Sequence, residues 1–597
     1  MKRMIALVLV CTLMCVSVTG HQPAVIAATV HDVLYLEVPQ DSYCRAPATT
    51  VYLPIMLGNL SADPSMLIQS IEVLDAKGQV MATERVAFKL ESLAGKAGSS
   101  DEIRTALGII PPTPADIATA RNLIAQATST ADSKQKSILI EQAFFASRAK
   151  QSMKNPEELT AEEAKIQQLL KPVTLAVDLA QFTTDTTSET AVPVTVRITG
   201  DLAGQTFTVD QQTMVFLLAS LPNGGMWHPG DGHVHTSGRI TNVITQPDTL
   251  SSYPLSAKEN YGFSDATDEA SILDRRNQAQ STGMQWIVVT DHAGNHTSFW
   301  TDEARLELEE WQNNIYQTAC SRATTLYSPT VTVCPGEELA TKEMLDPLQM
   351  TGHLLSYSNS SYAASYGTCG TLTTNVANAG GFGIIAHPYG GIPWSNWAAN
   401  PWRGLEVISN QVGYSTDAVN TWDTFLRNDI VNEIGESVRH VAMANSDVHS
   451  PSYVGWGKNM NYIYTGSYSA PGTSPSAVWN PIRQGTLTAS SDGSFAAATV
   501  NGVYPGNTAT IPAGSTVSVF VTGTPVSGLY TEAEVRVFRN GYLQLTPEVV
   551  PLSGINFTRY YSFAVPVDTY IRVEVWYRMG GSYAGYCFVN PVFIDTY

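Results

Sequence analysis

Residues 228–236 read HPGDGHVHT and follow a strand-like apolar stretch, TMVFLLASL, at residues 213–221. On an extended backbone the side chains of residues i and i+2 point to the same face, so His233 and His235 can present two imidazoles to one cation. An isolated HxH pair is more often two exposed histidines in a polar loop. The residues that follow along the chain decide between the two interpretations.

The composition is that of an ordered globular protein with more than one domain. The chain has 597 residues, more than a single hydrophobic core holds, and we expect about three domains. Apolar residues make up 44% of the chain and charged residues 15%. The formal net charge is −19, from 34 basic and 53 acidic residues. Because a polyanion binds to a basic surface, we expect no nucleic-acid partner.

The first residues have the organisation of a secretory signal peptide. Lys2 and Arg3 precede an apolar run, and small residues follow, ending at Ala27-Ala28. We predict a signal peptide over residues 1–28. No later stretch is apolar and long enough to span a bilayer, so we predict no transmembrane segment in the mature chain. We expect the protein to be secreted or extracytoplasmic, in the periplasm or outside the cell.

The two flanking regions have the pattern of β structure. Residues 29–225 alternate strand-like runs with turn residues, which predicts a β-sandwich. A helical insertion is expected at about residues 100–170, where Thr-Pro at 113–114 and Asn-Pro at 155–156 are typical of helix starts. Residues 491–597 carry short strands rich in Val, Thr and Tyr, and we predict a small C-terminal β domain.

Ligand-type side chains follow the apolar runs of residues 226–490. These runs alternate with helical stretches and are bounded by the motifs GDGHVHT, VTDHA, PGEEL, GHLLSY, IIAHP and NSDVH. In a barrel of parallel strands the C-terminal strand ends meet at one mouth, where such folds carry their sites. Six of the eleven histidines would then meet Glu338 and Asp447 in one pocket. Each alone is more often structural, but their joint placement favours a metal site.

These motifs, in this order, resemble those of the PHP (polymerase and histidinol phosphatase) metallohydrolase superfamily. The export signal, the GDGHVHT motif and the FVNPVFI sequence near the C-terminus resemble its carbaryl-hydrolase-like, or CehA/McbA-like, branch. The resemblance implies an α/β fold, a distorted seven-stranded (β/α) barrel over residues 226–490. It covers the residues after 491 only weakly and does not extend to residues 29–225.

The resemblance also implies a ligand set for a trinuclear metal cluster. The ligands of a first ion would be His233, His235, Glu338 and Asp447. The ligands of a second ion would be Glu338, His353 and His387, with Glu338 bridging the two. A third ion would take His292, His449 and an aspartate. We assign Glu338 rather than Glu337 because the fourth residue of PGxE is the ligand in the family pattern. Asp291 is assigned as a partner that orients an imidazole.

The aspartate of the third ion is displaced in this sequence. Similar proteins carry it shortly after HxHT, at a position that falls here on Ile240. We assign it to Asp265, because the segment after Asp265 resembles the usual helix and strand that follow that residue. Without Asp265 the cluster would be dinuclear.

Hydrolysis is the reaction class that such a cluster suits. Clustered divalent ions lower the pKa of bound water and supply a hydroxide nucleophile. We take His233, His235, Glu338 and Asp447 as the catalytic set. Mixed imidazole and carboxylate ligands suit zinc, manganese or iron, so the expected cofactors are two or three divalent transition-metal ions.

The sequence leaves three functions open, and we predict the first. A phosphoesterase would act on a small-molecule phosphoester, with basic candidates to hold the phosphate that are each more often solvated surface residues: Lys458, Arg275, Arg276 and His296. A carboxylic-ester or carbamate hydrolase would need no such residues. A non-catalytic metal-containing binding or surface protein is disfavoured by the nearly complete ligand set, because structural metal sites are usually closed and smaller.

Overall fold

The computed structural model describes residues 34–597 with gaps. The longest gaps are residues 95–101, 130–149, 152–165, 179–189, 236–268, 294–330, 343–349, 432–438 and 449–456. The predicted signal peptide at residues 1–28 lies outside the described residues. Within the described part of the chain, no helix has the length and apolar character to cross a membrane. The chain forms two compact units that meet in sequence between Ala219 and Ser220.

The first unit packs two sheets around a shared apolar core. One sheet has the order β1 (Leu34–Glu37), β3 (Thr50–Asn59) and β8 (Lys171–Asp178). The other has the order β2 (Asp41–Arg45), β10 (Gln205–Leu218), β9 (Thr190–Leu202), β4 (Leu67–Leu74) and β5 (Val80–Lys89). Apolar side chains of both sheets, such as Leu53 and Ile198, share one buried cluster.

The predicted helical insertion is described only in part. Helix α3 (Pro114–Ser129) begins at the proline of the Thr-Pro pair, where its missing N–H costs no helical hydrogen bond. The short strands β6 (Ile109–Ile110) and β7 (Lys150–Gln151) pair with each other. The helix predicted to start at Asn155-Pro156 lies outside the described residues.

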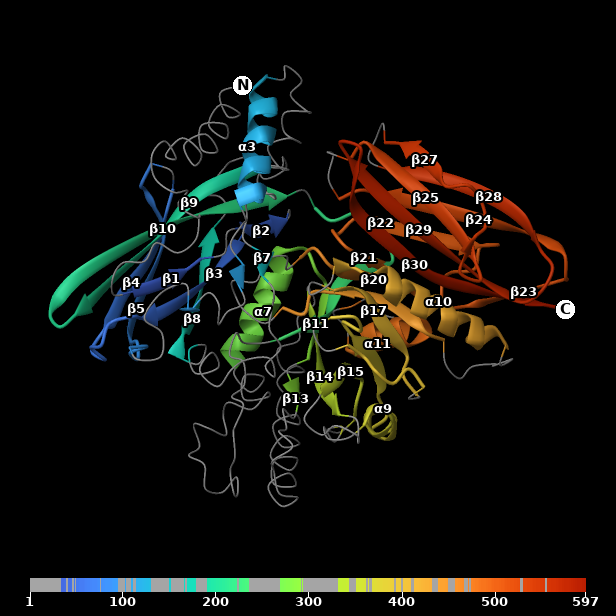
Figure 1. Cartoon of the computed structure of the whole chain (residues 1–597), viewed down its shortest axis with the longest axis horizontal. Helices are drawn as coiled ribbons and strands as arrows, with labels where there is room; N and C mark the ends of the chain where they lie inside the picture. Colours follow the sequence, from blue (N-terminus) through green and yellow to red (C-terminus); the bar gives the residue numbers. More distant parts are fainter. Residues whose placement is uncertain are drawn as a thin grey trace. The chain divides into compact units, whose positions relative to one another are not determined.

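The second unit contains the strands that carry the predicted ligands. They are β11 (Trp227–Val234), β12 (Trp286–Val289), β13 (His292–Ala293), β14 (Thr332–Lys342), β15 (Met350–Tyr357), β16 (Phe382–Ala386), β17 (Gly404–Ser409), β18 (Gly413–Tyr414), β19 (Val441–Asn445), β20 (Met460–Tyr464) and β21 (Leu487–Ser490). Most of these strands are buried along their whole length, which explains their continuous apolar runs. The helices of this unit are α7 (Glu269–Ser281), α9 (Cys369–Asn378), α10 (Thr416–Val431) and α11 (Ser476–Gln484) (Figure 1).

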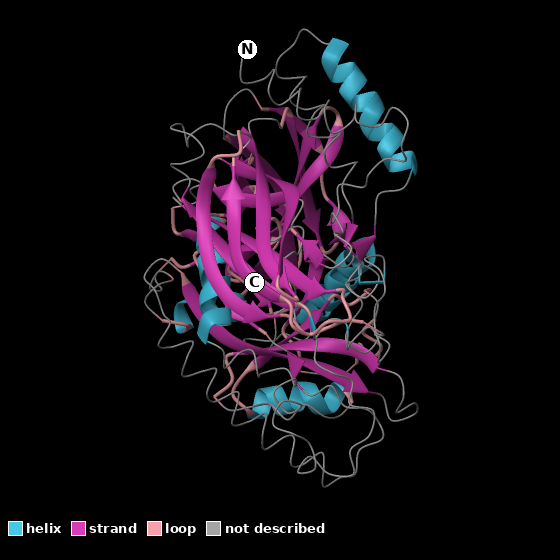
Figure 2. Cartoon of the chain, turned by 90° about the vertical axis from the view of Figure 1, so that its left-hand side faces the viewer, coloured by secondary structure: helices cyan, strands magenta, loops and turns pink. Residues whose placement is uncertain are grey.

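The predicted α/β fold class, with its distorted seven-stranded (β/α) barrel, is wrong. Among the described residues, strands make up 55% and helices 16%, and strands predominate in Figure 2. The ligand-bearing strands belong to a 17-stranded mixed sheet. Strand β20 pairs antiparallel with both β11 and β21, and β21 pairs antiparallel with the C-terminal strand β30 (Ser582–Thr596). An apolar run reveals that a strand is buried but not its direction or partners, and the sequence analysis therefore misjudged the class.

Strand direction explains how the ligands still converge. Strand β15 runs antiparallel to both β14 and β16, with Ala340 opposite His353 and His353 opposite Ala386. The beginning of β15 therefore lies beside the later part of β14 and the end of β16. A ligand near the start of β15 thus reaches the same place as ligands near the ends of its neighbours.

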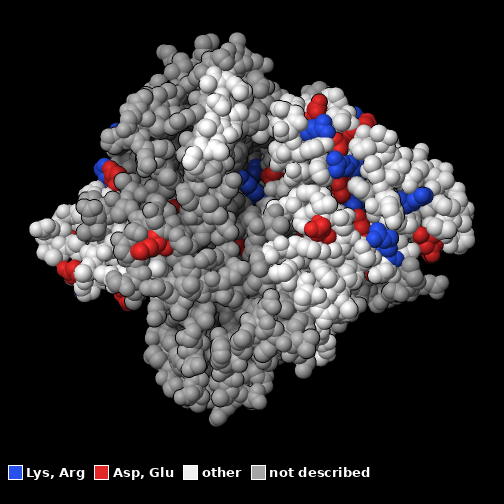
Figure 3. All heavy atoms as spheres, in the orientation of Figure 1, with Lys and Arg blue, Asp and Glu red and all other residues white. Residues whose placement is uncertain are grey.

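The C-terminal strands form two sheets around a second core. Strands β22 (Phe495–Val500), β24 (Ser515–Thr524) and β28 (Phe557–Val565) make a three-stranded sheet. The large sheet contributes β23 (Thr508–Ile511), β25 (Glu532–Arg539), β26 (Tyr542–Leu543), β27 (Glu548–Pro551), β29 (Thr569–Met579) and β30. Val519 and Val575 are among the buried side chains of the shared cluster. Acidic and basic side chains are interspersed over this region on the face shown in Figure 3.

A buried ion network joins α10 to the C-terminal strand β29. Arg572 donates from Nε to Asp423 Oδ1 and from Nη2 to Asp423 Oδ2, both at 2.7 Å. Its Nη1 donates to Glu574 Oε1 at 2.5 Å, and Tyr570 Oη donates to Asp423 Oδ1 at 2.8 Å. Arg572 is 2% exposed, so removal of a partner would leave a buried charge poorly compensated.

Replacement of Asp423 by alanine should therefore lower the free energy of unfolding by about 3–5 kcal/mol. Urea denaturation followed by circular dichroism would measure this loss. The control is Arg559→Ala, which breaks an ion pair with Glu548 whose side chains are 32% and 41% exposed. A solvated pair contributes at most about 1 kcal/mol. Equal losses in the two variants would contradict the predicted role of burial.

Candidate metal centre

Three strands bring the first group of four ligand-type side chains together. His233 lies in β11 and His235 directly follows it, Glu338 lies in β14, and Asp447 follows β19. All four residues are buried, and one ligand atom of each lies within 4.8 Å of the others. The HxH pair thus projects two imidazoles to one side of β11, and the acidic residues approach from two other strands.

The ligand atoms of the first group have nearly equal separations. His233 Nε2 lies 3.2 Å from His235 Nε2 and 3.1 Å from Asp447 Oδ1. Glu338 Oε2 lies 3.4 Å from His233 Nε2 and 3.1 Å from His235 Nε2. His235 Nε2 and Asp447 Oδ1 are 3.3 Å apart. The atoms thus occupy the corners of a compact polyhedron.

These separations fit a tetrahedral metal site. Bonds of about 2.0–2.1 Å from a central ion to four ligands place the ligands about 3.3 Å apart. Two imidazole nitrogens that face each other and two carboxylate oxygens all offer lone pairs to the same point. Such a set is stabilised by a cation or by protons at its centre. The residues present therefore fit a divalent ion.

A second group of three ligand atoms lies beside the first. His353 Nδ1 is 2.7 Å from Glu338 Oε1, and His387 Nε2 is 3.2 Å from the same oxygen. The two imidazole nitrogens are 3.3 Å apart. His353 lies in β15 and His387 directly follows β16. Because three protein ligands leave positions of a metal free for water or substrate, this group suits a reactive site.

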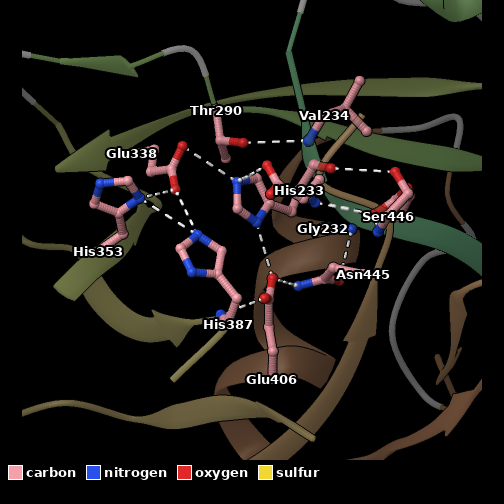
Figure 4. A network of polar contacts seen from close by, with 12 residues as sticks. Gly232, His233, Val234, Thr290, Glu338, His353, His387, Glu406, Asn445 and Ser446 are labelled. Atoms are coloured by element: carbon pink, nitrogen blue, oxygen red, sulfur yellow. Dashed lines mark hydrogen bonds and ion pairs between the residues drawn. The ribbon is translucent and has the colours of Figure 1, made fainter. Parts of the chain in front are cut away.

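Glu338 belongs to both groups and is placed there by strand alternation. Its Oε2 faces the first group and its Oε1 the second (Figure 4). The neighbouring Glu337 points to the opposite face of β14, where its Oε2 accepts a hydrogen bond from Asn359 Nδ2 at 2.7 Å. Burial holds the pKa of Glu337 well above its usual range. The structure thus places Glu338, rather than Glu337, in the cluster.

Glu406, which none of the sequence motifs contains, supports the cluster from β17. Its Oε1 lies 2.9 Å from His233 Nδ1 and accepts from Asn445 Nδ2 at 2.8 Å. Its Oε2 accepts from the backbone N–H of His387 at 2.6 Å. A glutamate in the middle of the apolar strand GLEVIS was the available signal, because a carboxylate buried on such a strand needs strong partners.

The backbone around His233 is held by close contacts. Asp231 Oδ1 accepts from the N–H groups of His233 and Ser446 at 3.0 and 3.2 Å, and burial raises the pKa of Asp231 to about 7. Tyr357 Oη donates to the carbonyl of Gly232 at 2.5 Å. A Cβ at Gly232 would lie 2.7 Å from that hydroxyl, so glycine lets the GDGHVHT strand approach its neighbours.

Two ligand residues have a left-handed backbone. The φ angle is 25° at His387 and 52° at Asp447. Residues other than glycine seldom adopt this conformation, at a cost of about 1–3 kcal/mol each unless the surroundings hold it. Both residues follow strands that end at the cluster, so the turn of the backbone helps to aim their side chains inward.

Carboxylates dominate the electrostatics of the cluster. Burial by itself lowers the pKa of His233, but Asp447, Glu338 and Glu406 outweigh it and hold that pKa well above its usual range. Burial likewise lowers the pKa of His235, and hydrogen bonds to Asp447 and Glu338 outweigh burial and raise it. Without an ion, the carboxylates thus favour the protonated form of both imidazoles.

The remaining predicted ligands are not placed in the cluster by the structure. Asp265 and His449 lie outside the described residues, as do Asp291 and His296. The backbone of His292 pairs with that of Glu338, but its side chain is not described. The third ion therefore stays a prediction.

The predicted phosphate-binding arginines have other roles in the described residues. Arg275 is 1% exposed and donates from Nε to the carbonyl of His235 at 2.7 Å. Arg276 is half-buried and donates to Asn277 Oδ1 at 3.0 Å. Lys458 is half-buried and lies two residues before β20 begins. Arg275 thus supports the end of β11.

Comparison with known proteins gives no family. No protein-family model and no curated protein matches the chain. Solved structures with remote likeness include a glycosyl hydrolase family 2 member from Bacteroides cellulosilyticus, 9% identical over 94% of this chain and 63% of that chain, with a TM-score of 0.16. A putative beta-galactosidase from Bacteroides fragilis is 8% identical over 95% of this chain and 72% of that chain, with a TM-score of 0.17.

The chain thus spans less than two thirds of the family 2 member's length. Likeness at these TM-scores supports neither a shared fold nor a shared activity. The function is therefore inferred from the cluster itself.

The shared carboxylate gives the first prediction about the cluster. Glu338→Ala should lose both ions, because each group loses a ligand, whereas His353→Ala should lose only the second. Metal content after equilibrium dialysis against Zn²⁺ would be measured by mass spectrometry. Glu337→Ala is the matched control, since its carboxylate faces away, and should bind like the unmutated protein. Equal metal content in the Glu338 and Glu337 variants would contradict the bridging role.

The raised pKa values of His233 and His235 predict that metal affinity increases with pH. The neighbouring carboxylates raise the pKa of both imidazoles in the metal-free chain, and a proton held at a ligand nitrogen must leave before an ion binds there. The affinity should therefore rise by about tenfold per pH unit for each displaced proton until the raised pKa values are passed. Calorimetric titration with Zn²⁺ in buffers of different ionisation enthalpy would count the released protons. If Zn²⁺ binding released no protons, the predicted increase of affinity with pH would be wrong.

Proposed function

We propose that this protein is a metal-dependent hydrolase with at least two divalent ions, and that its substrates are small-molecule phosphoesters. The observation that carries the proposal is the pair of ligand groups joined by Glu338, with separations that fit metal coordination. Two ions that share a carboxylate typically lie about 3.5–4 Å apart. The donor chemistry supports zinc, manganese or iron.

Bound ions would acidify water and neutralise negative charge on the substrate. The chain's own residues supply the frame for this chemistry. His233, His235, Glu338 and Asp447 fix one position with four ligands and exclude water from it, since all four are at most 2% exposed. Glu338 shares its carboxylate with His353 and His387, and an ion held by these three ligands would keep a coordination position open for water or substrate.

A relationship to PHP-type hydrolases is also proposed, on the order of the motifs and on the ligand set. It does not extend to the predicted barrel. Phosphoesters are favoured as substrates because paired cations can hold both the attacking and the leaving oxygen of a displacement at phosphorus.

A carboxylic-ester or carbamate hydrolase is the second candidate, and one observation favours it. Arg275, a predicted phosphate ligand, is buried and bound to the carbonyl of His235. A neutral ester or carbamate needs no cationic side chain beside the ions. With a phosphoester as substrate, the ions alone would have to balance the negative charge of the phosphate.

Rates on matched aryl substrates would test the proposal. The metal-free protein would be loaded with Zn²⁺ or Mn²⁺ and supplied with an aryl phosphate, an aryl ester and an aryl glycoside that release the same phenol. The aryl phosphate should be hydrolysed at least about 100-fold faster with metal than without. The double variant His233→Ala, His235→Ala should lose this gain.

The other outcomes are distinct. Metal-dependent hydrolysis of the ester alone would replace the phosphoesterase by the second candidate. Metal-dependent hydrolysis of none of the substrates, with metal bound, would favour a non-catalytic metal-containing binding protein. Hydrolysis that persists unchanged in the double variant would place the active site elsewhere.

A further inference from the structure

Glu406 occupies a position between the two ligand groups. It lies in the middle of β17, is 2% exposed, and is flanked along the strand by Leu405 and Val407, which are completely buried. Its carboxylate lies between His233 and His387 (Figure 4). These two residues belong to different groups of the proposed metal centre.

Three donors converge on the two oxygens of Glu406. Oε1 receives hydrogen bonds from Asn445 Nδ2 at 2.8 Å and His233 Nδ1 at 2.9 Å, and Oε2 receives one from the His387 N–H at 2.6 Å. An ionised carboxylate is a pure acceptor. A carboxylate at this position can therefore accept all three hydrogen bonds at once.

The contact on Oε1 sets the tautomer of His233. With the proton on Nδ1, the lone pair of Nε2 points at His235, Glu338 and Asp447. An imidazole held in this way by a carboxylate is oriented for metal binding and is a stronger ligand.

The hydrogen bond to Oε2 helps to fix the backbone conformation of His387. That residue has a φ of 25°, and a short hydrogen bond from its N–H helps to hold this strained conformation. Its imidazole Nε2 meets Glu338 Oε1 and His353 Nδ1. Displacement of this backbone would displace a ligand of the second group.

We infer that Glu406 is a positioning residue that couples the two metal positions, one oxygen holding His233 for the first ion and the other holding His387 for the second. The inference rests on the proposed two-ion centre. Glu338 joins the two positions through direct ligation, and Glu406 joins them through the orientation of their ligands.

A glutamine amide has a single oxygen. It could therefore accept hydrogen bonds at only one of the two positions that the carboxylate oxygens of Glu406 occupy. In Glu406→Gln the amide carbonyl should occupy the place of Oε1, because two donors converge there. The NH₂ group would then face the N–H of His387, donor against donor. The first ion should be retained and the second weakened by about 10–100-fold, the usual effect of losing a partner that orients a ligand.

Stepwise calorimetric titration of the full-length, metal-free chain with Zn²⁺ would test this. The unmutated protein should bind two ions, and Glu406→Gln should weaken one of them selectively. Glu337→Gln is the matched control: it is a buried glutamate on the opposite face of β14 and should leave both affinities unchanged. In the His353→Ala background, where the second group is broken, Glu406→Gln should change the affinity of the remaining ion by less than about threefold.

The possible results distinguish a failure of the role inferred for Glu406 from a failure of the proposed two-ion centre. An unmutated protein that binds no Zn²⁺ would overturn the two-ion centre. Two ions in the unmutated protein and unchanged affinities in Glu406→Gln would overturn the role of Glu406 and leave the centre standing. Equal weakening by Glu337→Gln would show a general loss of packing and would also overturn that role.

A measurement on the unmutated protein makes the test independent of whether the variant folds. With histidines labelled by nitrogen-15, the zinc-loaded protein should show an imidazole that coordinates through Nε2 and keeps a slowly exchanging Nδ1–H, as expected for His233 against Glu406. The signal should be absent in His233→Ala. A zinc-loaded protein without such a proton would overturn the inference.

Discussion

The second unit holds a cluster of nitrogen and oxygen atoms whose lone pairs point toward one another. The surrounding structure must keep these atoms together although they repel. The nitrogens of His233 and His235 and the oxygens of Glu338 and Asp447 lie 3.1–3.4 Å from one another where their contacts are given, in a place almost closed to water. Atoms of this kind repel unless positive charge lies among them. Protons can supply the charge in the metal-free chain, as the raised pKa values of the two histidines indicate. The strands, the close approach at Gly232 and the left-handed turns at His387 and Asp447 hold the acceptors together against their repulsion.

The surrounding residues give this centre a layered construction. Ligands come from β11, β14 and β15 and from the residues after β11, β16 and β19. A second set of groups holds them: Asp231 and Glu406 bind backbone N–H groups and a ring nitrogen of the ligands, and Asn445 donates to Glu406. The outer groups are themselves buried and hydrogen-bonded. Rigidity of this sort limits how far a ligand can move when an ion arrives or leaves. The buried Arg275 belongs to the same frame, because its Nε donates to the His235 carbonyl.

Local chemistry was more predictable from the sequence than architecture. The spacing of HxH fixes which face of β11 the imidazoles occupy, and alternation along β14 separates Glu338 from Glu337, because both follow from the geometry of a single strand. The fold class was misjudged because continuous apolar runs do not encode strand direction, and the antiparallel course of β15 and β20 is decided by partners far away in the chain. Glu406 was missed for a related reason: its contacts lie on three other segments, which no local pattern identifies. Asp265, His292 and His449 remain predictions that the described residues do not address.

The adjacent glutamates of β14 have a consequence for how this sequence can change. Glu337 and Glu338 point to opposite faces, one to Asn359 and the other to the four histidines of the cluster. A shift of β14 by a single residue would exchange the two faces and still leave a carboxylate in the cluster, but it would reverse every other side chain of the strand. Insertions and deletions in this strand should therefore be tolerated far less than substitutions. Apart from the identity of Glu338, length is thus the property of β14 that selection would guard.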